Sequence, residues 1–107
     1  MLQQVSDKRP AFDQPLFNLG QLAMTPGVEA VAERGEFNPI QYLARHQSGD
    51  WGELPPSDWN LNNRSVSRNP KERGRLFSAY VLPCGTKIWV ITEWDRSVTT
   101  ILLPDEY

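Results

Sequence analysis

Three stretches rich in β-branched and aromatic residues follow one another near the end of the given sequence. They run from Leu76 to Leu82, from Lys87 to Trp94 and from Val98 to Leu103, and short turn sequences separate them. Gly85 places a residue that tolerates positive φ in the first of these turns. Because such stretches favour extended backbone, the spacing predicts two successive hairpins, and therefore a three-stranded antiparallel meander.

Two helix-start signals precede these strands. Thr25-Pro26 and Asn38-Pro39 each pair an N-cap residue with a proline at the first helical position. The first helix is expected to end at Gly35 and the second near Ser48-Gly49. Trp51 is predicted to pack in the seam between the helices and the sheet. Since a three-stranded sheet needs a cover, we predict an α+β fold with two short N-terminal helices packed on a C-terminal three-stranded antiparallel β-meander.

The chain of 107 residues suits a single domain. Residues 1–13 mix charge, proline and glutamine without periodicity, which predicts a flexible arm ahead of one domain at 14–107. Residues 16–20 alternate weakly and are interpreted as a short edge strand or an extended lead-in. No window approaches the roughly 20 apolar residues of a membrane span, and Cys84 is the only cysteine. We therefore expect a cytoplasmic protein without an intrachain disulfide.

Positive charge is concentrated in one segment, although the net charge is −2. Between residues 62 and 75 a single acid, Glu72, stands against five basic residues. These are Arg64, Arg68, Lys71, Arg73 and Arg75. Two interpretations are open: a phosphate-binding strip on an otherwise acidic body, or a solvated loop whose arginines pair with nearby acids.

Neither face of the predicted sheet is plainly polar. One face is expected to pack on the helices, whereas the other keeps aromatic area that suits a partner, a ligand groove or cover from residues 51–61. Trp89 and Trp94 differ in strand parity, and Trp94 is expected to be the more exposed of the two. The predicted binding residues are Arg73, Arg75, Tyr80, Trp94 and Arg96.

His46 is the only histidine and the only unperturbed side chain that titrates near neutrality. Asp50, four residues later, could orient its imidazole as a general base; alternatively, His46 is a helix C-terminal residue that favours the helix dipole. Convergence of His46 with Glu93 and either Arg75 or Arg96 would supply the base, acid and cation of a small metal-independent ribonuclease. No metal or cofactor is expected, because one histidine and one cysteine make a poor ligand set.

Four segments carry a resemblance that extends over about residues 16–107. They are 43–52, 74–80, 85–93 and 95–104, which read LARHQSGDWG, GRLFSAY, GTKIWVITE and DRSVTTILLP. These segments resemble a family of small proteins from bacterial plasmids and integrative elements, described as plasmid-related proteins and sometimes as restriction-modification subunits. The chain lacks a Gly-rich cofactor loop and is too short for a methyltransferase domain, so only the first description is adopted here.

The resemblance implies a setting on mobile DNA in a bacterial cell, without catalytic residues to carry over. We therefore predict a non-enzymatic binding or accessory protein that acts on a macromolecule of the host or of the element, inhibition of a host defence complex being one form of this. The alternatives are the small ribonuclease and a weak nucleic-acid-binding protein that uses residues 64–75.

Overall fold

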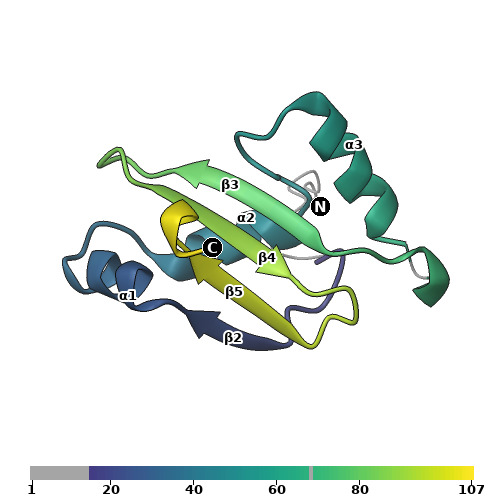
Figure 1. The fold of residues 1–107 in the computed structure, drawn as a ribbon, viewed down its shortest axis with the longest axis horizontal. Coiled ribbons are helices and arrows are strands. Elements are labelled where there is room, and N and C mark those ends of the chain that lie inside the picture. The colour runs from purple at the N-terminus through teal and green to yellow at the C-terminus, as the bar shows by residue number, and fades with distance from the viewer. Residues whose placement is uncertain (1–14, 68) are drawn as a thin grey trace, which may run out of the picture.

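The computed structural model describes residues 15–67 and 69–107, which form an α+β fold around one four-stranded sheet (Figure 1). The arm predicted at residues 1–13 lies outside the described residues. The strands are β2 (Gln21–Met24), β3 (Leu76–Val81), β4 (Lys87–Thr92) and β5 (Val98–Leu102). The helices are α1 (Pro26–Glu33), α2 (Pro39–Gln47) and α3 (Pro56–Ser65), and the 3₁₀ turns are η2 (Pro70–Glu72) and η3 (Pro104–Glu106).

The prediction of two helices on a three-stranded antiparallel meander is wrong. The sheet is mixed, in the order β2-β5-β4-β3, because β2 pairs in parallel with β5 at the edge of the antiparallel strands β3, β4 and β5. The structure also has a third helix, α3, which the predicted two-helix fold does not contain. Strand β2 follows directly after Gly20, whose φ of +69° and close approach to the Ser97 carbonyl bring the chain alongside β5.

Helix α1 is capped from a distant part of the chain. Thr25 precedes the helix, but its hydroxyl donates to the Glu106 carboxylate of η3 instead of capping its own helix. The N–H of Gly27 donates to Oε2 of the same carboxylate over 2.9 Å. An acidic group at this position satisfies a free donor of the first turn and favours the helix dipole. As a result, η3 is fastened to the beginning of α1.

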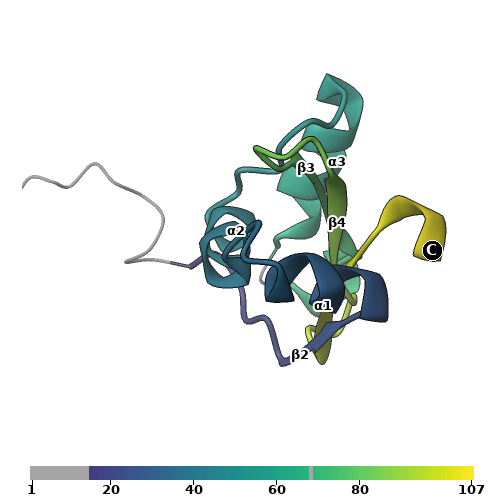
Figure 2. The same cartoon turned by 90° about the vertical axis from the view of Figure 1, so that its left-hand side faces the viewer.

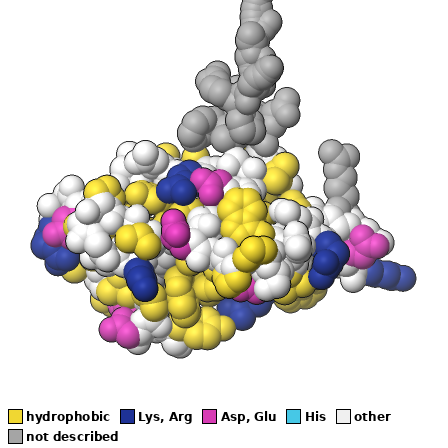
Figure 3. Space-filling model, turned by 90° about the horizontal axis from the view of Figure 1, so that it is seen from above, with side chains coloured by type: hydrophobic (Ala, Val, Ile, Leu, Met, Phe, Trp, Pro, Cys, Tyr) yellow, Lys and Arg dark blue, Asp and Glu magenta, His cyan; other side chains and the backbone are white. Residues whose placement is uncertain are grey.

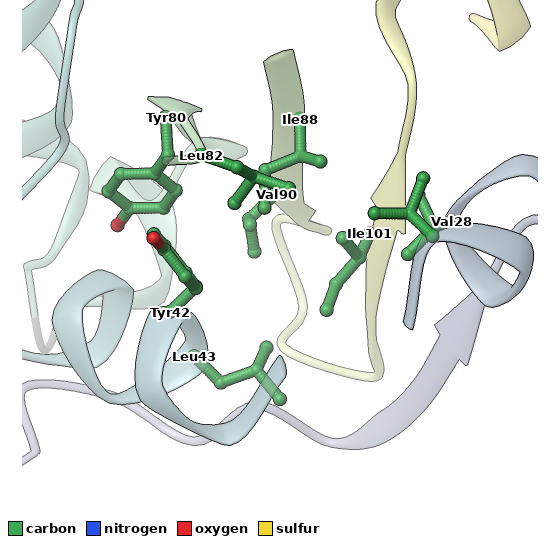
Figure 4. Packing of buried hydrophobic residues seen from close by; sticks show 9 residues of the cluster. Val28, Tyr42, Leu43, Tyr80, Leu82, Ile88, Val90 and Ile101 are labelled. Carbon is green, nitrogen blue, oxygen red and sulfur yellow. The ribbon is translucent and has the colours of Figure 1, made fainter. Parts of the chain in front are cut away.

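The sheet has two unlike faces. Viewed edge-on in Figure 2, the sheet has α2 on one side and η3 on the other; we call the α2 side the inner face and the opposite side the outer face. Apolar side chains of α1, α2 and the inner face form the core shown in Figure 4. Its buried members are Val28, Val31, Tyr42, Leu43, Tyr80, Leu82, Ile88, Val90 and Ile101.

The free edge of β3 is closed by its own chain. The N–H of Ala79 donates to the Trp51 carbonyl over 3.1 Å, and the Ala79 carbonyl accepts from the N–H of Glu53 over 2.6 Å. Gly52 makes this approach possible, because a Cβ there would lie 2.0 Å from the Ala79 oxygen. The Trp51 side chain is fully buried, in agreement with its predicted place in the seam.

Candidate functional site

The outer face carries a row of aromatic and aliphatic side chains. Phe77 of β3 and Trp89 of β4 lie on neighbouring strands and meet edge to face, with ring centroids 5.0 Å apart. Ile91 follows Trp89 by two residues and therefore lies on the same face. The strand pattern predicts aromatic area on one face of the sheet, and the outer face carries it.

Tyr107 adds a third ring to this row. Its ring centroid lies 5.6 Å from that of Trp89, and it directly follows η3, which the Glu106 carboxylate ties to α1. The three rings, with one arginine and one isoleucine, line a groove of about 330 Å³. We call it the aromatic groove, and its lining residues are Arg75, Phe77, Trp89, Ile91 and Tyr107.

Arg75 is the charged residue of the aromatic groove, and its position is fixed by two partners. Its Nε lies 3.5 Å from Oε1 of Glu93, and its Nη1 donates to the Tyr107 hydroxyl over 3.3 Å. The hydrogen bond to Tyr107 and the nearby Glu93 carboxylate raise the pKa of Arg75. The side chain is still about half exposed, so a guanidinium is presented to solvent at the rim of the groove.

His46 lies in the interior, on the inner side of the sheet, with no exposed surface. Its Nδ1 is 2.6 Å from the Ser78 hydroxyl and its Nε2 is 3.0 Å from the Thr92 hydroxyl. A hydrogen bond of 2.6 Å joins the Thr92 hydroxyl to the Thr99 hydroxyl, and the Thr99 hydroxyl donates to the Leu19 carbonyl over 2.7 Å. A buried imidazole with both nitrogens bonded is a satisfied core histidine.

The order of donors along this chain determines the tautomer of His46. The Leu19 carbonyl is only an acceptor, so Thr99 donates to it, and Thr92 must therefore donate to Thr99. Thr92 has then used its proton and accepts from Nε2–H of His46. A neutral imidazole with its proton on Nε2 has a bare Nδ1, which accepts from the Ser78 hydroxyl.

The environment of His46 keeps it neutral. Burial, and secondarily the positive charge of Arg96, lower the pKa of His46 to about 3. Asp50 does not orient the imidazole, because its carboxylate accepts a hydrogen bond from Nε of Arg45 over 2.7 Å. An unexposed, neutral imidazole has no route to a substrate in this conformation.

Arg96 holds the turn after β4 to the end of α3. Its guanidinium donates to the carbonyls of Ser65 and Gly74 over 2.6 and 2.7 Å, and more weakly to the carbonyls of Glu93 and Trp94. Arg96 itself has a φ of +61°, which is uncommon for a residue other than glycine. Burial, followed by the charge of Arg73, lowers its pKa. These contacts make Arg96 a structural residue of the turn.

Two other predicted binding residues lie away from the outer face. Tyr80 points to the inner face, is almost fully buried and donates its hydroxyl to the Asp50 carbonyl over 2.6 Å. Burial raises its pKa. Trp94 is 57% exposed, but it lies in the turn beyond β4 rather than in the aromatic groove. Tyr80 is therefore inaccessible, whereas Trp94 is an exposed side chain, as expected.

The basic segment does not form one surface with the aromatic groove. Arg73 donates from Nε to the Ser67 carbonyl over 3.2 Å and lines, with Arg96 and Asp95, a separate polar groove. Arg64 on α3 and Lys71 in η2 are exposed, and Arg68 lies outside the described residues. Among the described residues of this segment, only Arg75 lines the aromatic groove.

The four residues of the ribonuclease hypothesis do not share a cleft. Arg75 and Glu93 form an ion pair at the rim of the outer face, His46 lies on the inner side of the sheet, and Arg96 holds the turn. Within residues 15–67 and 69–107, no three His, Cys, Asp or Glu side chains are grouped so that they could bind a metal ion. Nor is any helix in these two ranges long and apolar enough to cross a membrane.

Sequence reasoning missed four residues of the aromatic groove. Phe77, Trp89 and Ile91 share one strand face, a signal that was present in the alternation of the two strands, although the predicted binding set did not use it. Tyr107 gave no such signal, because its place depends on the contact between Glu106 and α1. Comparison of the chain with models of protein families, with curated proteins and with solved structures found no match.

Proposed function

We propose that this chain is a non-enzymatic binding protein that receives a protein partner in the aromatic groove. One observation carries the proposal: three aromatic rings and a half-exposed arginine surround a groove of about 330 Å³ on the sheet face opposite α2. Tryptophan, tyrosine and arginine are the residues that most often dominate the binding energy of protein interfaces. Because the rings contact one another, they lose little conformational freedom on binding.

The charges around the groove favour a protein over a nucleic acid. Arg75 is paired with Glu93, so the groove offers little net positive charge to a phosphate backbone. From above Figure 1, where α3 lies, Figure 3 shows basic and acidic side chains interspersed instead of separated by sign. Arg75 is still about half exposed and lies beside apolar rings. This arrangement suits a partner that brings an apolar side chain and a carboxylate.

The setting of the partner rests on the resemblance alone. Similarity to proteins of plasmids and integrative elements suggests a partner from the bacterial host or from the element itself. Inhibition of a host defence complex is one activity that such binding would allow.

The test is affinity capture from a bacterial extract with wild-type protein and groove variants. Trp89→Ala removes the central ring, and Arg75→Glu reverses the charge at the rim. Trp94→Ala is the matched control, since it removes an exposed tryptophan outside the groove. Circular dichroism and thermal unfolding establish that each variant is folded.

We expect one partner to be recovered with wild type and Trp94→Ala, and lost with Trp89→Ala and Arg75→Glu. Binding should weaken by at least about 30-fold on loss of the tryptophan, corresponding to about 2 kcal/mol. Recovery that survives both groove variants but fails with Trp94→Ala would move the site to the turn and overturn the proposal. Salt-sensitive binding of homopolymeric RNA or DNA that depends on residues 64–75 would instead favour the nucleic-acid alternative.

A further inference from the structure

Strand β2 has an open edge, in contrast to β3. The N–H of Gln21 donates to the Ser97 carbonyl over 2.9 Å, and the N–H of Thr25 donates to the Ile101 carbonyl over 3.1 Å. In a parallel pair, alternate residues face the neighbouring strand, so the peptide groups of Leu22 and Met24 point away from β5. In the described part of the chain, no strand pairs with this side of β2.

Exposed apolar side chains accompany the open edge. Leu22 is 58% exposed and Met24 is 37% exposed, and both line a groove of about 280 Å³ between β2 and α2. Ile40, at the start of α2, lines the same groove and is 73% exposed. Unpaired backbone groups beside an apolar groove match an extended strand, whose backbone satisfies the edge while its side chains cover the groove.

We propose that the occupant is a second copy of this chain, with the two β2 strands paired antiparallel across a two-fold axis at Ala23. In this register Leu22 lies opposite Met24 of the second copy, and Met24 lies opposite Leu22 of the second copy. Each opposed pair exchanges two hydrogen bonds, because both residues present their peptide groups to the open edge. Four hydrogen bonds form, and the two sheets become one of eight strands.

The spacing of the edge residues favours self-pairing. The peptide groups of Leu22 and Met24 face the edge, with Ala23 between them. A two-fold rotation at Ala23 therefore places each of them opposite the other in the second copy, as an isologous interface requires. A shift that places Leu22 opposite itself brings Met24 opposite Gly20, whose φ of +69° takes it out of extended conformation. The register centred on Ala23 is therefore the one that uses both edge residues within the strand.

The same rotation brings the apolar side chains together. Leu22 and Met24 lie on the inner face with Thr99 and Ile101, their partners in the β2–β5 register. The two-fold axis is perpendicular to the sheet, so both inner faces lie on the same side. Leu22 of one copy then contacts Met24 of the other, beneath the exposed Ile40 side chains. The interface between the two copies is small, so we expect a dissociation constant of roughly 10–100 μM.

Sedimentation velocity over a concentration series is the test. Wild type should change from monomer to dimer as its concentration rises, whereas Leu22→Lys, which places a charge at the edge, should weaken dimerisation at least about tenfold. Leu61→Lys is the matched control, because Leu61 is 54% exposed on α3, remote from β2. Leu22→Pro removes only the N–H that faces the open edge, so it should prevent pairing while keeping the β2–β5 ladder.

Amide hydrogen exchange gives a second, residue-specific measurement. The N–H groups of Leu22 and Met24 should become protected as the concentration rises, whereas that of Ala23, which faces β5, should already be protected in the monomer. A monomer at every concentration up to about 1 mM would overturn the proposal. Equal loss of dimer in Leu22→Lys and Leu61→Lys would also overturn it, as would a dimer that only Trp89→Ala abolishes, which would move self-association to the aromatic groove.

Discussion

The side-chain amide of Asn62 pairs with the backbone of Phe77 as a neighbouring strand would. Its Nδ2 donates to the Phe77 carbonyl over 2.7 Å, and its Oδ1 accepts from the Phe77 N–H over 3.2 Å. Together with the contacts of Trp51 and Glu53 at Ala79, this amide occupies the edge of β3. The edge is thereby protected from pairing with other chains.

Replacement of Asn62 by alanine should destabilise the protein by about 2–3 kcal/mol, because two backbone groups of Phe77 lose their partners in a largely buried place. Asn60→Ala is the control, since Asn60 is exposed on the same helix. Urea unfolding measures both variants. Equal stability of the two would contradict the role given to the Asn62 amide.

The buried imidazole of His46 makes stability depend on pH. Its pKa is about 3 in the folded protein and near 6.5 in the unfolded chain, so the unfolded state binds the proton first as the pH falls. The contribution is complete above pH 6.5 and decreases as the pH falls toward 3. We expect a loss of about 2 kcal/mol at pH 5 relative to pH 7, measured as the free energy of unfolding in urea.

His46→Gln isolates this effect from the titration of carboxylates. The variant is expected to be less stable at neutral pH, but it should lose the part of the pH dependence that lies between 6.5 and 4.5. Because the chain has a single histidine, the ¹⁵N shifts of one imidazole should show the Nε2–H tautomer and no protonation down to about pH 4. Protonation near pH 6.5 would show that the side chain is solvated.

Two glycines with positive φ should respond differently to alanine. Gly85 has a φ of +93° and free space around its Cα, so Gly85→Ala should cost only about 1 kcal/mol for the backbone conformation. Gly52 has a φ of +77° and lies against the Ala79 carbonyl, so Gly52→Ala should cost more than about 3 kcal/mol or prevent folding. Thermal unfolding of both variants distinguishes the two cases.

Arg96 should contribute to stability through the carbonyls that it binds. Arg96→Ala leaves the Ser65 and Gly74 carbonyls without this donor, at an expected cost of about 2–4 kcal/mol. Arg96→Lys should recover only part of this, because an ammonium group cannot span the same set of carbonyls. Arg64→Ala, an exposed position on α3, serves as control; a similar loss there would count against the assignment.

The sequence predicted best where structure depends on neighbouring residues. The strands 76–81, 87–92 and 98–102 and the helices that begin at Pro26 and Pro39 lie where alternation and N-cap patterns placed them. Strand β2 was not predicted, because its pairing depends on β5, far along the chain, and none of its four side chains is buried. Helix α3 has few apolar residues, so its sequence shows no clear helical period.

The candidate site was harder to predict, because a contact made by one residue positions another. Tyr107 reaches Trp89 since Glu106 binds the start of α1. His46 is unavailable since strand parity directs Ser78 and Thr92 inward to meet it. Arg96 looked like a free cation in the sequence, but the loops that approach it supply four carbonyl acceptors. Residue types and spacing do not contain these relationships.

The parallel pairing of β2 with β5 also has a consequence during protein synthesis. Gln21 pairs with Val98 and Met24 with Ile101. The ribosome therefore releases β2 long before it has made the residues with which β2 pairs. Until then, Leu22 and Met24 have no sheet to join and are open to chaperones or to other nascent chains. The order of translation therefore keeps β2 out of the sheet until β5, the last of the four strands to be made, is available.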